Sequence, residues 1–178
     1  MCGGFEQKRW LREQLTAAKD TDKCLVVAVH HPPFSLDRPH GGSPEILSAL
    51  DRAITDSGKA PDVVFSGHVH SYQRFTRRTN GRDLPFIVGG AGGYAHFPKA
   101  MHKLQTNPDD GSPIQTPFQT TVTGVTLEAY NDTEPGFLRV TVDDKTLTAE
   151  YFLVPFEGTP PTDPADAFTL NWKKHKIV

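Results

Sequence analysis

Two apolar runs that each end in histidines decide the fold: Leu25-Val-Val-Ala-Val-His-His31 and Val63-Val-Phe-Ser-Gly-His-Val-His70. Short unbroken apolar runs are typical of strands that are buried on both faces. Between them, Ser43 and Gly58 supply the start and stop signals of a helix that carries an apolar stripe. A strand, a helix and a second strand predict a βαβ unit, with parallel strands joined by a right-handed crossover.

The segments on either side of this unit extend the fold. Residues 5–18 have apolar side chains at helical spacing. Asn80-Gly81 lies between two strand-like stretches, 75–79 and 84–88, and this dipeptide is typical of a tight hairpin. The predicted fold class is therefore α/β, or α+β layered, with a mixed sheet. We expect a single domain over residues 1–178. Its parts are a motif-bearing part at 5–93, a long loop at 95–124, a β-meander at 136–154 and a tail at 155–178.

Composition excludes several classes of protein. Lysine and arginine number 19 against 21 acidic residues, so the chain lacks the basic excess of a nucleic-acid-binding protein. The longest apolar run is far shorter than the roughly 20 residues that cross a bilayer, so we expect no membrane partner. Residues 1–8 contain no signal peptide, and the chain as written reads as cytoplasmic, with its localisation left open.

Histidines follow both predicted strands at the point where each strand ends. His30 and His31 close the first strand, and His68 and His70 close the second. The carboxyl ends of parallel strands meet at one edge of a sheet, where ligands bind, with a strand spacing of about 5 Å. His68 and His70 point the same way if the chain is extended. This pattern favours a metal site built from imidazoles; the alternative is a set of hydrogen-bonded surface histidines.

These motifs resemble a known family. His30-His-Pro-Pro33 after one apolar strand, and Gly67-His-Val-His-Ser-Tyr-Gln-Arg74 after another, are similar to the last two motif blocks of the calcineurin-like metallophosphoesterases. Trp10-Leu-Arg-Glu-Gln-Leu15 is similar to the helix before the first of these strands. The purple acid phosphatases are the branch that the motifs resemble most. The resemblance implies the C-terminal half of an αββα sandwich with a mixed sheet.

The resemblance also implies roles for individual residues. His30 and His68 would bind one metal ion of a binuclear pair, and His70 would bind the other. His40 would contact the phosphate of a phosphate ester substrate or protonate its leaving group, and His31 would be a nearby supporting group or a substrate contact. The implied metal is iron, zinc or manganese, because all three suit imidazole ligands and the sequence does not choose among them.

The carboxylate ligands of such a centre are absent from the sequence. In this family they come from three blocks, Gly-Asp-x-His, Gly-Asp-x-x-Tyr and Gly-Asn-His-Asp/Glu, whereas none of the 15 glycines here precedes Asp or Asn. Three imidazoles alone could hold one divalent ion but offer no negative charge to offset a second. We therefore expect an incomplete site, with one ion or none bound. We also expect an exposed sheet edge that leads to a homo-oligomer or to pairing with a missing N-terminal half.

Three functions remain open at this point. The first is an acid phosphatase-like phosphoesterase with a binuclear site that is incomplete in this chain. The alternative is a non-catalytic metallophosphoesterase-fold module that self-associates or pairs with a partner, and the third is a mononuclear hydrolase.

Two further sequence features each allow two interpretations. Gly89-Gly-Ala-Gly-Gly93 predicts close approach to substrate or a tight turn, and Arg74, Arg77, Arg78 and Arg82 predict anion steering or an ordinary hairpin surface. We expect His96, His102 and His175 to be solvated.

Overall fold

The computed structural model describes residues 4–93 and 101–178, and it begins with the predicted βαβ unit. Helix α1 (Phe5–Ala17) leads to strand β1 (Val26–Val29), helix α2 (Pro44–Ser57) and strand β2 (Val63–Ser66). The hydroxyl of Ser43 accepts a hydrogen bond from the Ile46 amide at the start of α2, and Gly58 ends that helix in the left-handed conformation. β1 pairs with β2 in parallel, as the sequence predicted.

The predicted hairpin is also present and makes the sheet mixed. Strands β3 (Tyr72–Thr79) and β4 (Arg82–Gly89) pair in antiparallel fashion. Asn80 and Gly81 both have positive φ, at 50° and 71°, which a two-residue turn of this kind requires. β4 pairs in parallel with β2, and the six-stranded sheet has the order β1-β2-β4-β3-β6-β5. Strands β5 (Phe118–Gln119) and β6 (Val125–Asn131) complete it.

A second, antiparallel sheet contains four strands in the order β10-β9-β8-β7. Strands β7 (Gly136–Val142) and β8 (Thr146–Leu153) form the predicted meander. The stretch 155–178, which we predicted to be a tail, instead contains β9 (Asp166–Asn171) and β10 (Lys176–Ile177). The physical reason is burial, because Phe168, Leu170 and Trp172 alternate along the chain and all three face the core.

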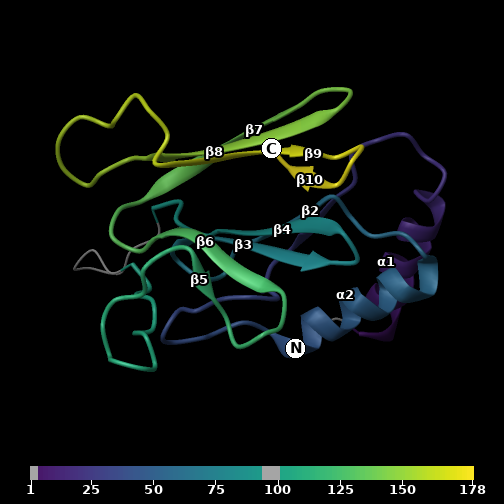
Figure 1. Cartoon of the computed structure of the whole chain (residues 1–178), viewed down its shortest axis with the longest axis horizontal. Coiled ribbons are helices and arrows are strands. Elements are labelled where there is room, and N and C mark those ends of the chain that lie inside the picture. The colour runs from purple at the N-terminus through teal and green to yellow at the C-terminus, as the bar shows by residue number, and fades with distance from the viewer. Residues whose placement is uncertain (1–3, 94–100) are drawn as a thin grey trace.

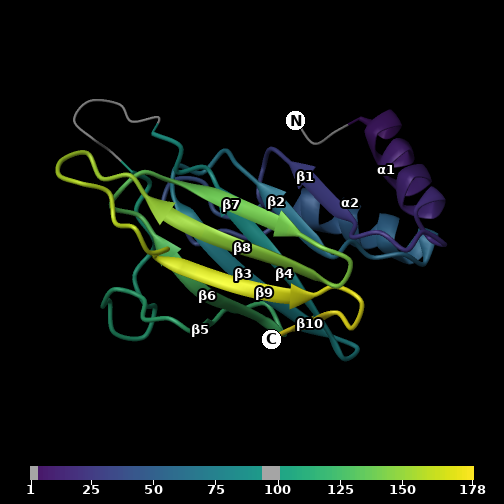
Figure 2. The ribbon, with the colours of Figure 1, turned by 90° about the horizontal axis from the view of Figure 1, so that it is seen from above.

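The elements stack in three layers. Figures 1 and 2 show the second sheet lying on one face of the six-stranded sheet, while α1 and α2 lie beside β1 and β2 on the other face. The apolar run of β2 faces a core on each side: Val63 packs into the core between the sheets, and Val64 packs into the core under the helices. Among the described residues, no helix is long and apolar enough to span a membrane.

A polar cluster ties the two sheets together. The Arg74 guanidinium makes two hydrogen bonds to the Asp166 carboxylate, at 2.7 and 2.8 Å, and the Tyr72 hydroxyl donates to the same carboxylate at 2.6 Å. The Tyr72 and Tyr151 rings stack with centroids 4.0 Å apart. Burial raises the pKa of the Tyr72 hydroxyl, and the adjacent Asp166 carboxylate raises it further. This cluster is a structural one, since it satisfies its own charges inside the core.

The arginines of the hairpin are paired with carboxylates. Besides Arg74 with Asp166, the pairs are Arg77 with Asp51, Arg78 with Glu128, and Arg82 with Asp62. A guanidinium that is already neutralised by a neighbouring carboxylate contributes little to the attraction of a distant anion. The pairing argues against anion steering, and an ordinary solvent-facing surface describes only Arg78, because the side chains of Arg74, Arg77 and Arg82 are mostly buried.

Candidate metal centre

The candidate site begins where β1 and β2 end. Because these strands are parallel neighbours, His30 and the Gly67–His68 segment leave the sheet side by side, and the Gly67 amide donates to the His30 carbonyl at 3.1 Å. His68 then takes a positive φ of 64°, which is uncommon for a residue other than glycine. The result is a distance of 3.1 Å between Nε2 of His30 and Nδ1 of His68.

Three imidazoles form the first group of the site. The ligand atoms of His30, His31 and His68 all lie within 4.8 Å of one another. Burial lowers the pKa of His68, and the neighbouring imidazoles of His31, His40 and His30 lower it further. A neutral imidazole has a lone pair for a metal ion, and bonds of about 2.1 Å would bring one ion within reach of both His30 and His68. This donor set fits one transition metal ion.

His70 lies apart from this group, although the sequence motif places it two residues after His68. Its ring stacks on the His102 ring, with centroids 4.3 Å apart and an angle of 20° between the planes. Its backbone amide donates to Nδ1 of His102 at 3.0 Å. The positive φ at His68 breaks the extended geometry that would have pointed both imidazoles in the same direction.

A second group of possible ligands surrounds a buried carboxylate. The ligand atoms of Asp37, His40 and His102 lie within 4.8 Å of one another. The Asp37 side chain is fully buried, and its Oδ2 lies 3.0 Å from Nδ1 of His40 and 3.8 Å from Nδ1 of His102. Sequence reasoning predicted His40 as a substrate contact but missed Asp37, for which the signal was an acidic residue three positions earlier in the same loop.

His102 corrects one of the sequence predictions. It is half-buried rather than solvated, because its ring packs between those of His40 and His70. Burial lowers its pKa, and the imidazoles of His70 and His40 lower it further. Its own backbone amide donates to the His70 carbonyl at 3.0 Å. No local pattern identified His102, because it reaches the site from a segment that is distant in sequence.

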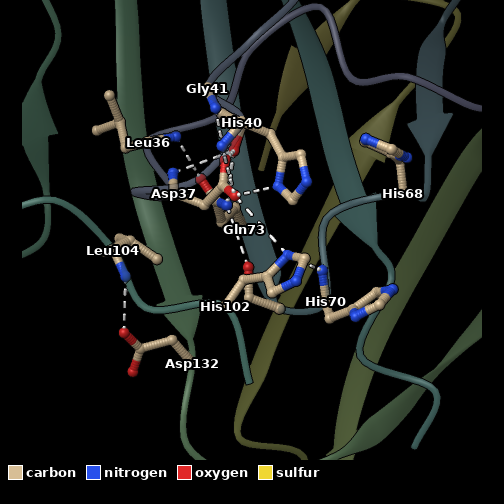
Figure 3. Close-up of polar contacts among 12 residues, drawn as sticks. Leu36, Asp37, His40, Gly41, His68, His70, Gln73, His102, Leu104 and Asp132 are labelled. Carbon is tan, nitrogen blue, oxygen red and sulfur yellow. Dashed lines mark hydrogen bonds and ion pairs between the residues drawn. The ribbon is translucent and has the colours of Figure 1, made fainter. Parts of the chain in front are cut away.

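The two groups form one continuous site. The His40 ring lies 4.8 Å from the rings of both His68 and His102, measured between centroids, and so links the two groups. Figure 3 shows the His40 ring between Asp37 and His68, with His102 and His70 below it. Six imidazoles thus follow one another across the carboxyl ends of β1 and β2, with one carboxylate beneath them.

Two other histidines lie elsewhere. His175 is half-buried rather than solvated, and its Nδ1 lies 3.1 Å from an oxygen of Asp62. Asp62 directly precedes β2, so His175 lies at the opposite end of that strand from His68. Burial and the neighbouring Arg82 lower its pKa. His96 lies outside the described residues.

The glycine run after β4 supports the site loop from behind. A Cβ atom at Gly90 would lie 2.0 Å from the carbonyl oxygen of Val69, which is the residue between His68 and His70. Only glycine lets the two backbones approach so closely. Of the two readings of the run, close contact with substrate and a tight turn, neither describes Gly90, since its role is packing against the loop that carries the histidines.

A likeness to solved structures shows that this chain has the metallophosphoesterase fold. A purple acid phosphatase structure from yellow lupin (Lupinus luteus) superimposes with a TM-score of 0.59 at 19% sequence identity, covering 94% of this chain and 28% of that one. No family model matches the chain.

Sequence comparison finds similarity to one branch of proteins with this fold. Purple acid phosphatase 22 of Arabidopsis thaliana is 33% identical over 81 residues, which are 45% of this chain and 18% of that protein. A probable purple acid phosphatase 20 of the same plant is 37% identical over 76 residues, 42% of this chain and 18% of that protein. The predicted resemblance to the purple acid phosphatase-like branch is thus confirmed over roughly half of the chain. The matched residues amount to about a fifth of the length of these relatives.

Proposed function

We propose that this chain carries part of the catalytic centre of a metal-dependent phosphoesterase that hydrolyses phosphate esters. The observation that carries the proposal is the 3.1 Å approach of His30 and His68 at the carboxyl ends of two parallel strands. The similarity to purple acid phosphatases supports phosphate ester hydrolysis as the reaction class. Imidazole ligands suit iron, zinc or manganese.

Each histidine has a role in this proposal. His30 and His68 hold one metal ion, His70 serves the second, and His40 and His31 contact the phosphate ester. Bound metal ions in such centres polarise a phosphoryl oxygen and lower the pKa of a bound water. The chain itself orients the imidazoles: the strand ends fix His30 and His68, and the stack with His102 fixes His70. The loop that follows β1 places His40 between the two groups.

We propose further that the centre is completed at the exposed edge of β1. In the described part of the chain, β1 has a strand partner on one side only. A groove of about 540 Å³ runs along this edge and includes His30 and His31 among its lining residues. Two of its apolar side chains, Trp10 and Val26, are 60% and 44% exposed. The occupant that fits is a strand-bearing part of the same type of domain, which supplies carboxylates to the three-histidine group.

A metal-binding experiment tests the proposal. The protein, purified through a sizing column, is loaded with zinc, manganese or iron and its metal content is measured, together with hydrolysis of p-nitrophenyl phosphate. His68→Ala is the site variant. His175→Ala is the matched control, because it also replaces a half-buried histidine of positive φ but lies at the other end of β2. We expect His68→Ala to lose bound metal and any hydrolysis, while the control retains both. Wild-type protein that binds none of these metals would overturn the proposal.

A further inference from the structure

The loop after β1 is organised around the carboxylate of Asp37. Oδ1 accepts hydrogen bonds from the Ser35 hydroxyl at 2.9 Å and the Gly41 amide at 2.8 Å. Oδ2 accepts a longer one, at 3.3 Å, from the backbone amide of His40. The side chain is fully buried, so these bonds replace water and hold the carboxylate in one orientation. A buried carboxylate with this many donors is fixed before any ligand arrives.

Asp37 also determines how the imidazole of His40 is presented. Nδ1 of His40 lies 3.0 Å from Oδ2, and since a carboxylate is an acceptor, Nδ1 is the nitrogen that carries the proton. In a neutral imidazole, the hydrogen bond at one ring nitrogen determines whether the other nitrogen carries a proton. Nε2 is thereby left as the nitrogen that faces away from Asp37, and Figure 3 shows this side of the ring turned toward His68.

The His40 ring also packs against the His102 ring, with centroids 4.8 Å apart. Nδ1 of His102 accepts from the His70 amide at 3.0 Å, so its own hydrogen bond holds the ring in place. The segment that carries His102 is anchored by backbone hydrogen bonds: the Arg38 amide donates to the Lys103 carbonyl, and the Gln105 amide donates to the Leu36 carbonyl. The ring of His40 is therefore confined between a buried carboxylate and an anchored imidazole.

We propose that Asp37 is a positioning residue that holds His40 in the Nδ1–H tautomer and directs Nε2 toward the phosphate ester. The direction toward substrate rests on the proposed phosphoesterase function, whereas the tautomer follows from the contacts alone. The carboxylate acts on the reaction through His40 and touches neither substrate nor metal. Such supporting partners commonly change affinity or rate by about 10- to 100-fold when removed.

The tautomer is measured directly by long-range ¹H–¹⁵N NMR of the histidine side chains. In the wild-type protein we expect a protonated Nδ1 and an unprotonated Nε2 for His40. Asp37→Asn replaces one oxygen by an amide NH₂, which donates rather than accepts, and we expect it to convert His40 to the Nε2–H tautomer. Ser35→Ala is the matched control, since it removes a hydrogen bond to Oδ1 but leaves Oδ2 facing His40. It should leave the tautomer unchanged.

Each result has a defined meaning. A wild-type His40 with its proton on Nε2 overturns the proposal, and this holds even if Asp37→Asn does not fold. A zinc titration provides the second test. If zinc binding removes the Nδ1 proton of His40, and Asp37→Asn binds one ion fewer than the wild-type protein, Asp37 is a metal ligand and the proposal is wrong. Where hydrolysis is measured, we expect Asp37→Asn to lower kcat about tenfold or more with KM little changed. Wild-type protein that binds neither zinc, manganese nor iron would refute the proposed function and leave the tautomer result standing.

Discussion

Two polar clusters on the six-stranded sheet differ in how their groups are satisfied. Between the sheets, the Arg74 guanidinium and the Asp166 carboxylate neutralise each other, with side chains only 12% and 15% exposed. At the carboxyl ends of β1 and β2, by contrast, the ring centroids of His31 and His68 lie 4.2 Å apart, and within the described part of the chain no carboxylate belongs to their three-histidine group. The first cluster stabilises the fold by itself, while the second places like groups together and, on the proposed function, would gain stability from a bound metal ion.

The largest expected effect comes from breaking the cluster between the sheets. Arg74→Met would leave the Asp166 carboxylate without its charged partner in the core, and we expect it to lower the free energy of unfolding by about 3–5 kcal/mol. Urea unfolding of the metal-free protein measures this. Zinc affinity of the folded fraction should stay at the wild-type value, because the arginine lies between the sheets.

The control for this variant is Arg139→Met on β7. Arg139 also makes two hydrogen bonds to a carboxylate, that of Glu150, but its side chain is 59% exposed. Exposed pairs contribute about 0–1 kcal/mol, so we expect little change. Equal losses for the two variants would show that burial of the inter-sheet pair does not set its contribution.

The next effect links stability with the site. Gly90→Ala places a Cβ atom 2.0 Å from the Val69 carbonyl oxygen, so the backbone between His68 and His70 must move. We expect a loss of about 1–3 kcal/mol in the free energy of unfolding, together with weaker zinc binding by calorimetry. Gly92→Ala is the control, since a Cβ there meets no atom within 4 Å. Unchanged zinc affinity in Gly90→Ala would mean that the loop position does not control the site.

A smaller effect should have the opposite sign. His68 has a φ of 64°, a conformation that costs a residue with a side chain about 1–2 kcal/mol relative to glycine. His68→Gly should therefore raise the free energy of unfolding of the metal-free protein by about 1 kcal/mol and abolish zinc binding. His175→Gly, at a φ of 54°, relieves a similar strain away from the site and should retain zinc binding. A His68→Gly variant that is both less stable and still binds zinc would contradict the distinction between the clusters.

The sequence predicted the parts of the fold that local signals specify. Ser43, Gly58 and Asn80-Gly81 act within a few residues of their own positions, and the helix and hairpin they specify are present. β9 was missed because a proline-rich stretch precedes the alternation of Phe168 and Leu170, and only the partner strand β8 makes that alternation a buried face.

The same limit applies to the site. The proximity of His30 and His68 could be predicted from the sequence, because strand pairing alone places them at one edge of the sheet. Asp37 and His102 could not, because their approach depends on hydrogen bonds between two loops, such as the one from the Gln105 amide to the Leu36 carbonyl. Loop-to-loop pairing leaves no periodic signal in the sequence.

The smallest effect concerns Cys24, which lies near the amino end of β1, away from His30. Burial, with a further contribution from the Asp62 carboxylate, raises the pKa of the Cys24 thiol from 9.0 to about 11. A raised pKa in the folded state means that the thiol contributes full stability below pH 9 and loses that contribution as the pH rises toward 11.

Alkylation by iodoacetamide measures this shift, because only the thiolate reacts. In a Cys2→Ser background at pH 8, we expect Cys24 to react several-fold more slowly in the folded protein than in urea. The difference should narrow as the pH approaches 11. Added zinc should leave it unchanged, since the proposed metal ligands lie at the other end of the strand. Fast alkylation at pH 8 in the folded state would show that the amino end of β1 is as open to solvent as its carboxyl end. This result would contradict the distinction between a closed core and an open site along β1.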